Sequence, residues 1–137
     1  MREKIMKIIN LALLSILISA CSMNYNPRYY YHNIEVANLT GDTIRNLRVQ
    51  VGPEGRVLEC EEVTKNRICT ERFGKKPYPR DVVEVSWTGA DGQAVVEQVN
   101  PQIPLTFVPS HAVRLMLDIG EGNTVEAYFR QETIYQD

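Results

Sequence analysis

Residues 113–119 read Val-Arg-Leu-Met-Leu-Asp-Ile, with Val, Leu, Leu and Ile at every second position. Successive side chains of a β-strand point to opposite faces, so this alternation predicts a strand with one buried face and one solvated face. The same period of two recurs in residues 47–51, 83–87 and 125–129. No segment carries the apolar stripe of an amphipathic helix over several turns. The sequence therefore predicts an all-β protein.

Turn sequences rich in Gly, Pro, Asp and Asn separate the alternating segments. They fall at residues 40–42, 52–55, 74–79, 89–92 and 120–123. Prolines bracket one further run, residues 105–108, for which we expect an edge or connecting strand. About eight strands in roughly 100 residues predict a small antiparallel β-sandwich of immunoglobulin-like or transthyretin-like type. Residues 38–41 and 44–49 look like the first hairpin of immunoglobulin-like bacterial envelope modules.

The first 20 residues have the composition of a secretory signal peptide. Three of the first seven residues are basic, and residues 8–18 are apolar except for Asn10 and Ser15. In a helix this run spans about 17 Å, whereas the core of a bilayer is about 30 Å thick. We therefore expect residues 1–20 to be an export signal rather than a permanent membrane span.

The last residues of this signal, Ile18-Ser19-Ala20-Cys21, resemble the lipobox of bacterial lipoproteins. The resemblance implies that Cys21 receives a diacylglycerol through a thioether and becomes the acylated N-terminus after cleavage. Ser22 takes the place of the Asp that retains many enteric lipoproteins in the inner membrane. By that analogy the chain is anchored in the outer membrane of a bacterial envelope and faces the periplasm. Two or more acyl chains make such an anchor durable.

This processing divides the chain into four parts: a signal peptide (1–20), a lipidated N-terminus and tether (21–31), a sandwich domain (32–130) and a polar tail (131–137). Three consecutive tyrosines, residues 29–31, end the tether. They either begin the first strand or lie against the membrane interface, where amphipathic aromatic side chains are favoured.

Two further cysteines, Cys60 and Cys69, predict a disulfide, because an even pair in an exported domain is typical of one. A hairpin with its loop centred on Thr64 and Lys65 would place them opposite each other, within reach of a disulfide. A metal site would need further ligands at closer spacing, and a redox pair would need a Cys-x-x-Cys motif. Glutamates beside these cysteines predict ion pairs with arginines on a solvated hairpin.

The whole-chain charge is nearly balanced, with 15 basic and 17 acidic residues and a formal charge of −2. This balance argues against a nucleic-acid binder. The sequence has neither a Gly-x-Ser-x-Gly elbow nor a phosphate loop, and His32 and His111 have no His or Cys at ligand spacing. We therefore expect no enzymatic activity, no cofactor and no metal site.

A basic cluster around residues 72–80 supplies the candidate partner-binding loop, with Lys75, Lys76, Tyr78 and Arg80 as its contact residues. The alternatives are a solvated loop without a ligand, or contact of these cations with anionic lipid or glycan. The sequence thus predicts an anchored, non-enzymatic binding or assembly module for another envelope protein. One alternative is a structural lipoprotein of a secretion or pilus apparatus, as small transthyretin-like lipoproteins are in type VI secretion. Another is an enzyme or an enzyme inhibitor.

Overall fold

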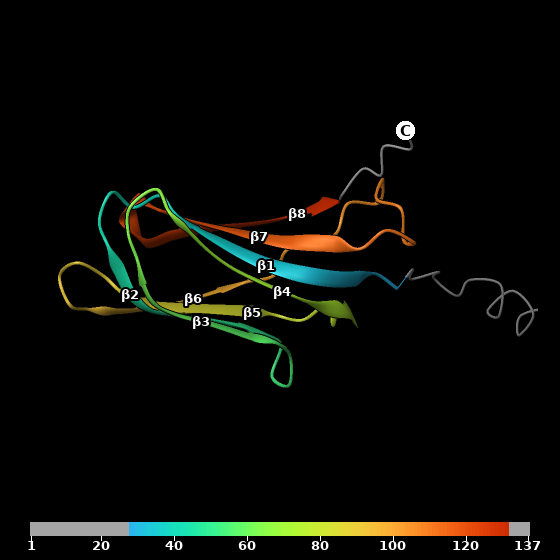
Figure 1. Ribbon diagram of the computed structural model, residues 1–137, viewed down its shortest axis with the longest axis horizontal. Helices are drawn as coiled ribbons and strands as arrows, with labels where there is room; N and C mark the ends of the chain where they lie inside the picture. The colour runs from blue at the N-terminus through green and yellow to red at the C-terminus, as the bar shows by residue number, and fades with distance from the viewer. Residues whose placement is uncertain (1–27, 132–137) are drawn as a thin grey trace, which may run out of the picture.

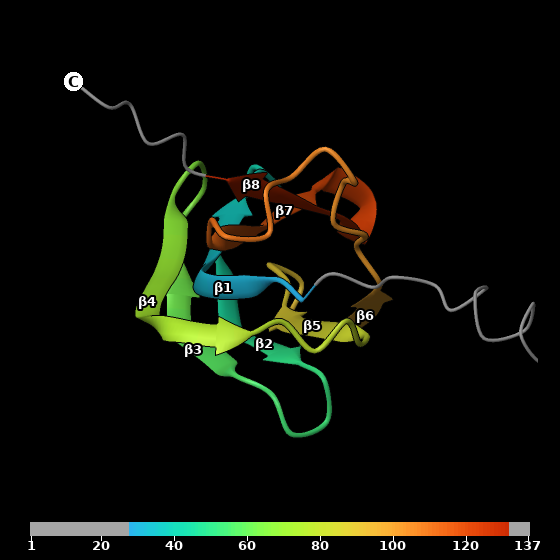
Figure 2. The same cartoon turned by 90° about the vertical axis from the view of Figure 1, so that its right-hand side faces the viewer.

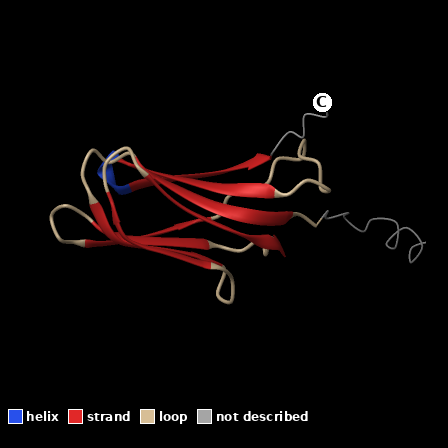
Figure 3. Cartoon of the chain, in the orientation of Figure 1, coloured by secondary structure: helices blue, strands red, loops and turns tan. Residues whose placement is uncertain are grey.

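The computed structural model describes residues 28–131, which form two β-sheets packed face to face (Figures 1 and 3). Cys21 and the rest of the predicted signal and lipobox, like residues 132–137 of the tail, lie outside the described residues. The strands are β1 (Tyr30–Asn38), β2 (Ile44–Val51), β3 (Val57–Val63), β4 (Ile68–Pro77), β5 (Val83–Thr88), β6 (Ala94–Val99), β7 (Val113–Gly120) and β8 (Thr124–Gln131). The prediction of an all-β sandwich of about eight strands is confirmed.

One sheet has the strand order β4-β1-β7-β8 and the other β3-β2-β5-β6. Neighbouring strands are antiparallel except for β1 and β7, which run parallel. Immunoglobulin domains keep their first two strands in one sheet, whereas β1 and β2 belong to different sheets here. Of the two types expected, the arrangement found therefore departs from the immunoglobulin one. The hairpin expected across residues 38–49 is wrong, because residues 39–43 cross from one sheet to the other.

The core is formed by the inward positions of the alternating segments. Val85 and Leu115 have no exposed surface, and Trp87 at the end of β5 is 2% exposed. Each such side chain contributes about 1.5–3 kcal/mol when it is fully buried. The turns expected at residues 89–92 and 120–123 do join antiparallel neighbours, β5 to β6 and β7 to β8. Alternation therefore identified both the core and these two hairpins.

The first strand begins two residues before residue 32, where we expected the sandwich domain to start. Strand β1 starts at Tyr30, and the side chains of Tyr29 and Tyr31 are buried in the core. Tyr29 and Tyr31 therefore lie at the start of the first strand, which was one of the two alternatives, rather than free for contact with a membrane interface. Tyr30 points the other way and is 38% exposed.

The predicted disulfide joins Cys60 to Cys69, with their Cα atoms 6.6 Å apart. The predicted hairpin is wrong, because β3 and β4 lie in different sheets. Cys60 pairs in register with Leu47 of β2, and Cys69 pairs with Val36 of β1. The bond therefore ties the two sheets together where their edge strands β3 and β4 face each other. The sequence did not reveal this, because a short polar turn can join two strands of different sheets as well as two strands of one hairpin.

Residues 105–108 do not form the expected strand. Phe107 donates its backbone N–H to the carbonyl of Pro104 (3.0 Å), and His111 donates to the carbonyl of Val108 (3.1 Å), so the segment is a succession of turns. Its prolines have no N–H to donate to a sheet and restrict φ, which explains why the alternation gives no strand.

Candidate functional site

A groove opens at the end of the sandwich where strand β1 begins. Figure 2 looks onto this end of the two sheets. The groove lies between the turn that joins β2 to β3 and the segment that follows β4, and it has a volume of about 600 Å³. Ligand-binding clefts fall in this size range. Its apolar lining includes Tyr31, Val51, Pro77 and Pro79, and its charged lining is Glu54, Arg56, Lys76 and Asp81.

Two glycines allow the β2–β3 turn to close one side of the groove. Gly52 has a φ of +74°, a conformation that residues with a side chain rarely adopt. At Gly55 a Cβ atom would overlap the carbonyl oxygen of Val51, so no other residue fits there. The Gly52 N–H donates to the carbonyl of Val82 at 3.0 Å, which fixes the turn against the start of β5.

Arg56 is held in place beside the groove. Its guanidinium lies 2.9 Å from the carboxylate of Glu71 and 4.5 Å from the centre of the Phe73 ring. The Phe73 ring in turn packs edge-to-face on Tyr31, with ring centres 4.9 Å apart. Burial raises the pKa of the Tyr31 hydroxyl, although hydrogen bonding with the Arg56 backbone and the Arg56 charge act in the opposite direction. The wall of the groove is thus rigid, with a neutral phenol at Tyr31.

The four residues of the candidate partner-binding loop have different positions in the structure. Lys75 and Lys76 are exposed, but they belong to the last part of β4 rather than to a loop. Tyr78 is 5% exposed and packs between the rings of Tyr31 and Phe129, so it is unavailable to a partner. The loop prediction is wrong in this part, because backbone pairing with β1 continues through Pro77.

Arg80, the fourth of these residues, lies over the ring of Tyr29, with the guanidinium carbon 5.7 Å from the ring centre. A cation at this distance from an aromatic face is attracted by the ring quadrupole. Lys76 lines the groove, whereas Arg80 lies on the aromatic residue that precedes β1. The two lysines are therefore exposed on β4, and Arg80 lies apart from them on the ring of Tyr29.

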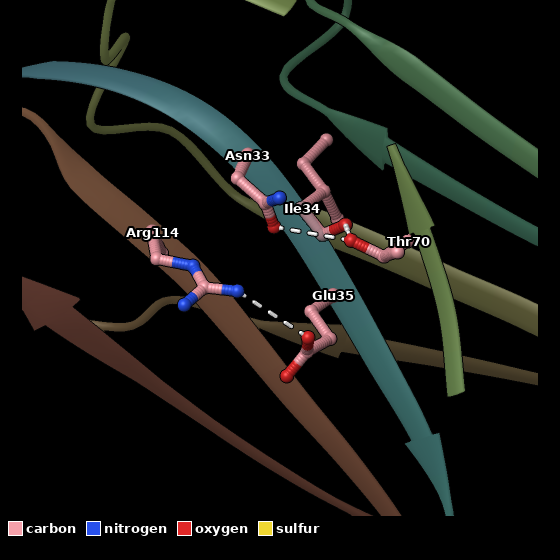
Figure 4. A network of polar contacts seen from close by, with 5 residues as sticks. All are labelled: Asn33, Ile34, Glu35, Thr70 and Arg114. Atoms are coloured by element: carbon pink, nitrogen blue, oxygen red, sulfur yellow. Dashed lines mark hydrogen bonds and ion pairs between the residues drawn. The ribbon is translucent and has the colours of Figure 1, made fainter. Parts of the chain in front are cut away.

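A polar network across three strands was not anticipated from the sequence (Figure 4). The hydroxyl of Thr70 on β4 donates to the side-chain oxygen of Asn33 (3.3 Å) and to the carbonyl of Ile34 (3.2 Å). Glu35 on β1 and Arg114 on β7 form an ion pair at 3.4 Å, with side chains 18% and 24% exposed. These groups pair across β4, β1 and β7, although the buried Nε of Arg114 has no hydrogen-bond partner within residues 28–131. We interpret the network as structural. The sequence offered one signal for this network, because Glu35 and Arg114 are oppositely charged residues on the two central strands of the sheet.

The carboxylates near the cysteines form ion pairs with a different strand from the one expected. Glu62 and Glu59 on β3 contact Arg45 (2.7 Å) and Arg48 (3.4 Å) on β2. These pairs are exposed and contribute little to stability. Within residues 28–131, no three His, Cys, Asp or Glu side chains are close enough together to hold a metal ion. In the same range there is no helix long and apolar enough to cross a membrane.

No protein-family model and no curated protein matches the sequence. One solved structure with a similar arrangement is an NMR structure of a protein from Eubacterium rectale. The two chains are 13% identical with a TM-score of 0.46, over 82% of this chain and 98% of that one. What the structure establishes is a disulfide-bonded β-sandwich with a groove at one end.

Proposed function

We propose that this chain is a lipid-anchored, non-enzymatic binding or assembly module of the bacterial cell envelope. The observation that carries the proposal is the lipobox-like sequence at residues 18–21, directly after an apolar signal and shortly before β1 at Tyr30. The Cys60–Cys69 disulfide supports export, because such bonds persist in oxidising compartments. With Ser22 after the anchor, the sandwich is held at the outer membrane and faces the periplasm.

The groove and the adjoining free edge of β4 form the partner-binding surface in this proposal. β4 is the outermost strand of its sheet, and an extended segment can add to such an edge through backbone hydrogen bonds. Lys75 and Lys76 stand exposed at this edge, and Lys76 also lines the groove. Their charge favours an acidic segment. We therefore propose a partner protein of the envelope that presents an extended acidic stretch.

Because the strand order departs from the immunoglobulin type, the transthyretin-like alternative is left, and with it a second candidate, a structural lipoprotein of a secretion apparatus. This candidate uses the same anchor and differs in its partners. Neighbouring genes for secretion components would support it, whereas their absence would favour the general binding module.

The anchor is tested by replacing its cysteine in a Gram-negative host. Cys21→Ala should abolish labelling by radioactive palmitate and leave the protein unprocessed or released from membranes. The double variant Cys60→Ala/Cys69→Ala is the matched control, and it should keep the label. A labelled, membrane-bound Cys21→Ala protein would contradict the proposal.

The binding surface is tested by site-specific photo-crosslinking in cells. A photoreactive residue at Lys76 should give a discrete crosslinked product, whereas the same residue at Lys65, an exposed lysine at the opposite end, should not. Lys75→Glu together with Lys76→Glu should reduce that product at least tenfold. Equal crosslinking from the two positions would rule out the groove and the β4 edge as the binding surface.

A further inference from the structure

The connection between β6 and β7 presents apolar side chains to solvent. The side chain of Leu105 is 94% exposed, and that of Val108 is 46% exposed. Single exposed apolar residues are common on protein surfaces. Leu105 differs from those because nearly all of its surface is exposed at a protruding turn, with a second apolar side chain three positions away.

The turn is held firmly in this position. The Tyr29 hydroxyl donates to the carbonyl of Phe107 at 3.1 Å, and the Phe107 side chain packs against the core. The Gln131 amide donates to the carbonyls of Val108 (2.6 Å) and His111 (3.0 Å). It also accepts a hydrogen bond from the N–H of Val108 (2.9 Å). These bonds fix the backbone so that Leu105 points away from the core.

This turn lies at the same end of the sandwich as Arg28, where the described chain begins (Figures 1 and 2). Only residues 22–27 separate Arg28 from Cys21. A fully extended chain of that length reaches about 25 Å. An acylated Cys21 would therefore hold this end of the domain close to the bilayer surface, a step that rests on the proposed function.

Charged side chains of both signs lie at this end, with the acidic Glu54 and Asp81 of the groove beside several basic residues. Arg28 is exposed, and Arg80 lies over Tyr29, the residue that braces the turn. Cations close to a bilayer are attracted by anionic headgroups. Apolar side chains buried at the headgroup boundary add their own transfer free energy.

We propose that residues 104–109 dock on the bilayer that holds the acyl chains, with Leu105 and Val108 at the headgroup boundary. The sandwich is then fixed in orientation rather than free to tumble on its tether. The groove, which opens at this same end, then lies next to the membrane, and the β4 edge extends away from it. The surface that contacts the apolar turn in this proposal is a bilayer containing anionic phospholipid.

The test uses the full lipidated protein in vesicles of phosphatidylethanolamine and phosphatidylglycerol. Leu105→Trp places a fluorophore on the turn, and brominated phospholipids quench only a tryptophan that lies in the bilayer. We expect the added fluorescence to fall by at least half. Leu39→Trp, which replaces an exposed leucine just after β1 at the opposite end, is the matched control and should remain unquenched.

The different failures of this test can be told apart. A protein that does not remain with the vesicles lacks the anchor, and this would overturn the proposed function. If the Leu105→Trp protein stays on the vesicles with its added fluorescence unquenched, the docking is overturned, and a protein partner would then be the occupant of the turn. Equal quenching in the Leu105→Trp and Leu39→Trp proteins would show a domain without a fixed orientation and would also overturn the docking.

Discussion

The two ends of the sandwich are closed by different chemistry. At the end away from Arg28, a single buried amide, Asn38, organises the loops. Its Nδ2 donates to the carbonyls of Asp42 (2.7 Å) and Val63 (2.9 Å). Its Oδ1 accepts from the backbone N–H (3.1 Å) and the hydroxyl (2.7 Å) of Thr40. The polar groups of this end are thus used within the fold.

The end near Arg28 is closed by aromatic rings instead. Tyr78 packs edge-to-face on Tyr31 and on Phe129, with ring centres 5.3 Å and 5.0 Å apart. Such ring pairs contribute about 0.5–1.5 kcal/mol beyond the area they bury. Lysines and the side chain of Leu105 remain exposed around these rings. The comparison shows one end organised by hydrogen bonds to a buried amide and the other by packed rings.

The largest effect should come from removing the amide that organises the far end. Asn38→Ala leaves the Val63 carbonyl and the Thr40 N–H without the side chain that pairs with them, while the Asp42 carbonyl keeps the Thr40 hydroxyl at 3.0 Å. We expect a cost of about 3 kcal/mol in total. Urea unfolding measures this loss. Asn100→Ala, at an exposed position, should change the unfolding free energy by less than about 0.5 kcal/mol. An equal loss of unfolding free energy in Asn38→Ala and Asn100→Ala would contradict the organising role of the Asn38 amide.

Removing the disulfide should have the next largest effect. Cys60→Ala/Cys69→Ala opens a short loop in the unfolded state, which lowers the unfolding free energy by about 2–3 kcal/mol. The bond ties β3 to β4 next to the turn at residues 64–67, so hydrogen exchange should accelerate there more than in the groove. Uniform acceleration over the whole domain would contradict this localisation.

The smallest effect concerns a hydroxyl at the aromatic end. The Tyr78 hydroxyl is buried and has no hydrogen-bond partner within residues 28–131. Tyr78→Phe should therefore be neutral at pH 7 or stabilise the fold by up to about 1 kcal/mol. Tyr30→Phe, at an exposed position, is the control and should change nothing. A loss of more than about 1 kcal/mol in Tyr78→Phe would reveal a partner for the hydroxyl.

The same variant gives a pH test. Burial, followed by the neighbouring Tyr31 and Asp81 charges, raises the pKa of Tyr78 well above its ordinary value. Above about pH 10 the unfolded chain loses the proton that the folded chain keeps, so stability falls as the pH rises. Wild-type protein should therefore lose more stability than Tyr78→Phe between about pH 9 and pH 11. If the stability of the two proteins falls equally with rising pH, the pKa of Tyr78 is not raised in the folded protein.

The sequence predicted the strands well, because period-two alternation depends only on the neighbours within each segment. β2 is found at the expected residues 44–51, and the inward side chains of residues 113–119 are buried. Alternation does not indicate which of the two sheets a strand belongs to, because the inward side chains of both sheets pack into the same core. The supposed hairpin between Cys60 and Cys69 failed for this reason.

The candidate site was predicted only in part, because exposure depends on distant residues. Lys75 and Lys76 are exposed as expected, but Tyr78 is buried by Tyr31 and Phe129, which lie far from it in the chain. The groove depends on a close approach of backbone within the β2–β3 turn, which a list of glycines does not reveal. The exposure of the turn at residues 104–109 likewise depends on hydrogen bonds from the last residue of β8.

The parallel pairing of β1 with β7 also has a consequence for the timing of folding. It joins Tyr31 to Val113, so the middle of one sheet cannot form until nearly the whole domain is present. Contacts so distant in sequence slow folding toward milliseconds or seconds. A chain that crosses a membrane N-terminus first, as its signal predicts, would therefore remain unfolded during transit. In the proposed export, the sheet is therefore completed only after its last two strands, β7 and β8, have crossed.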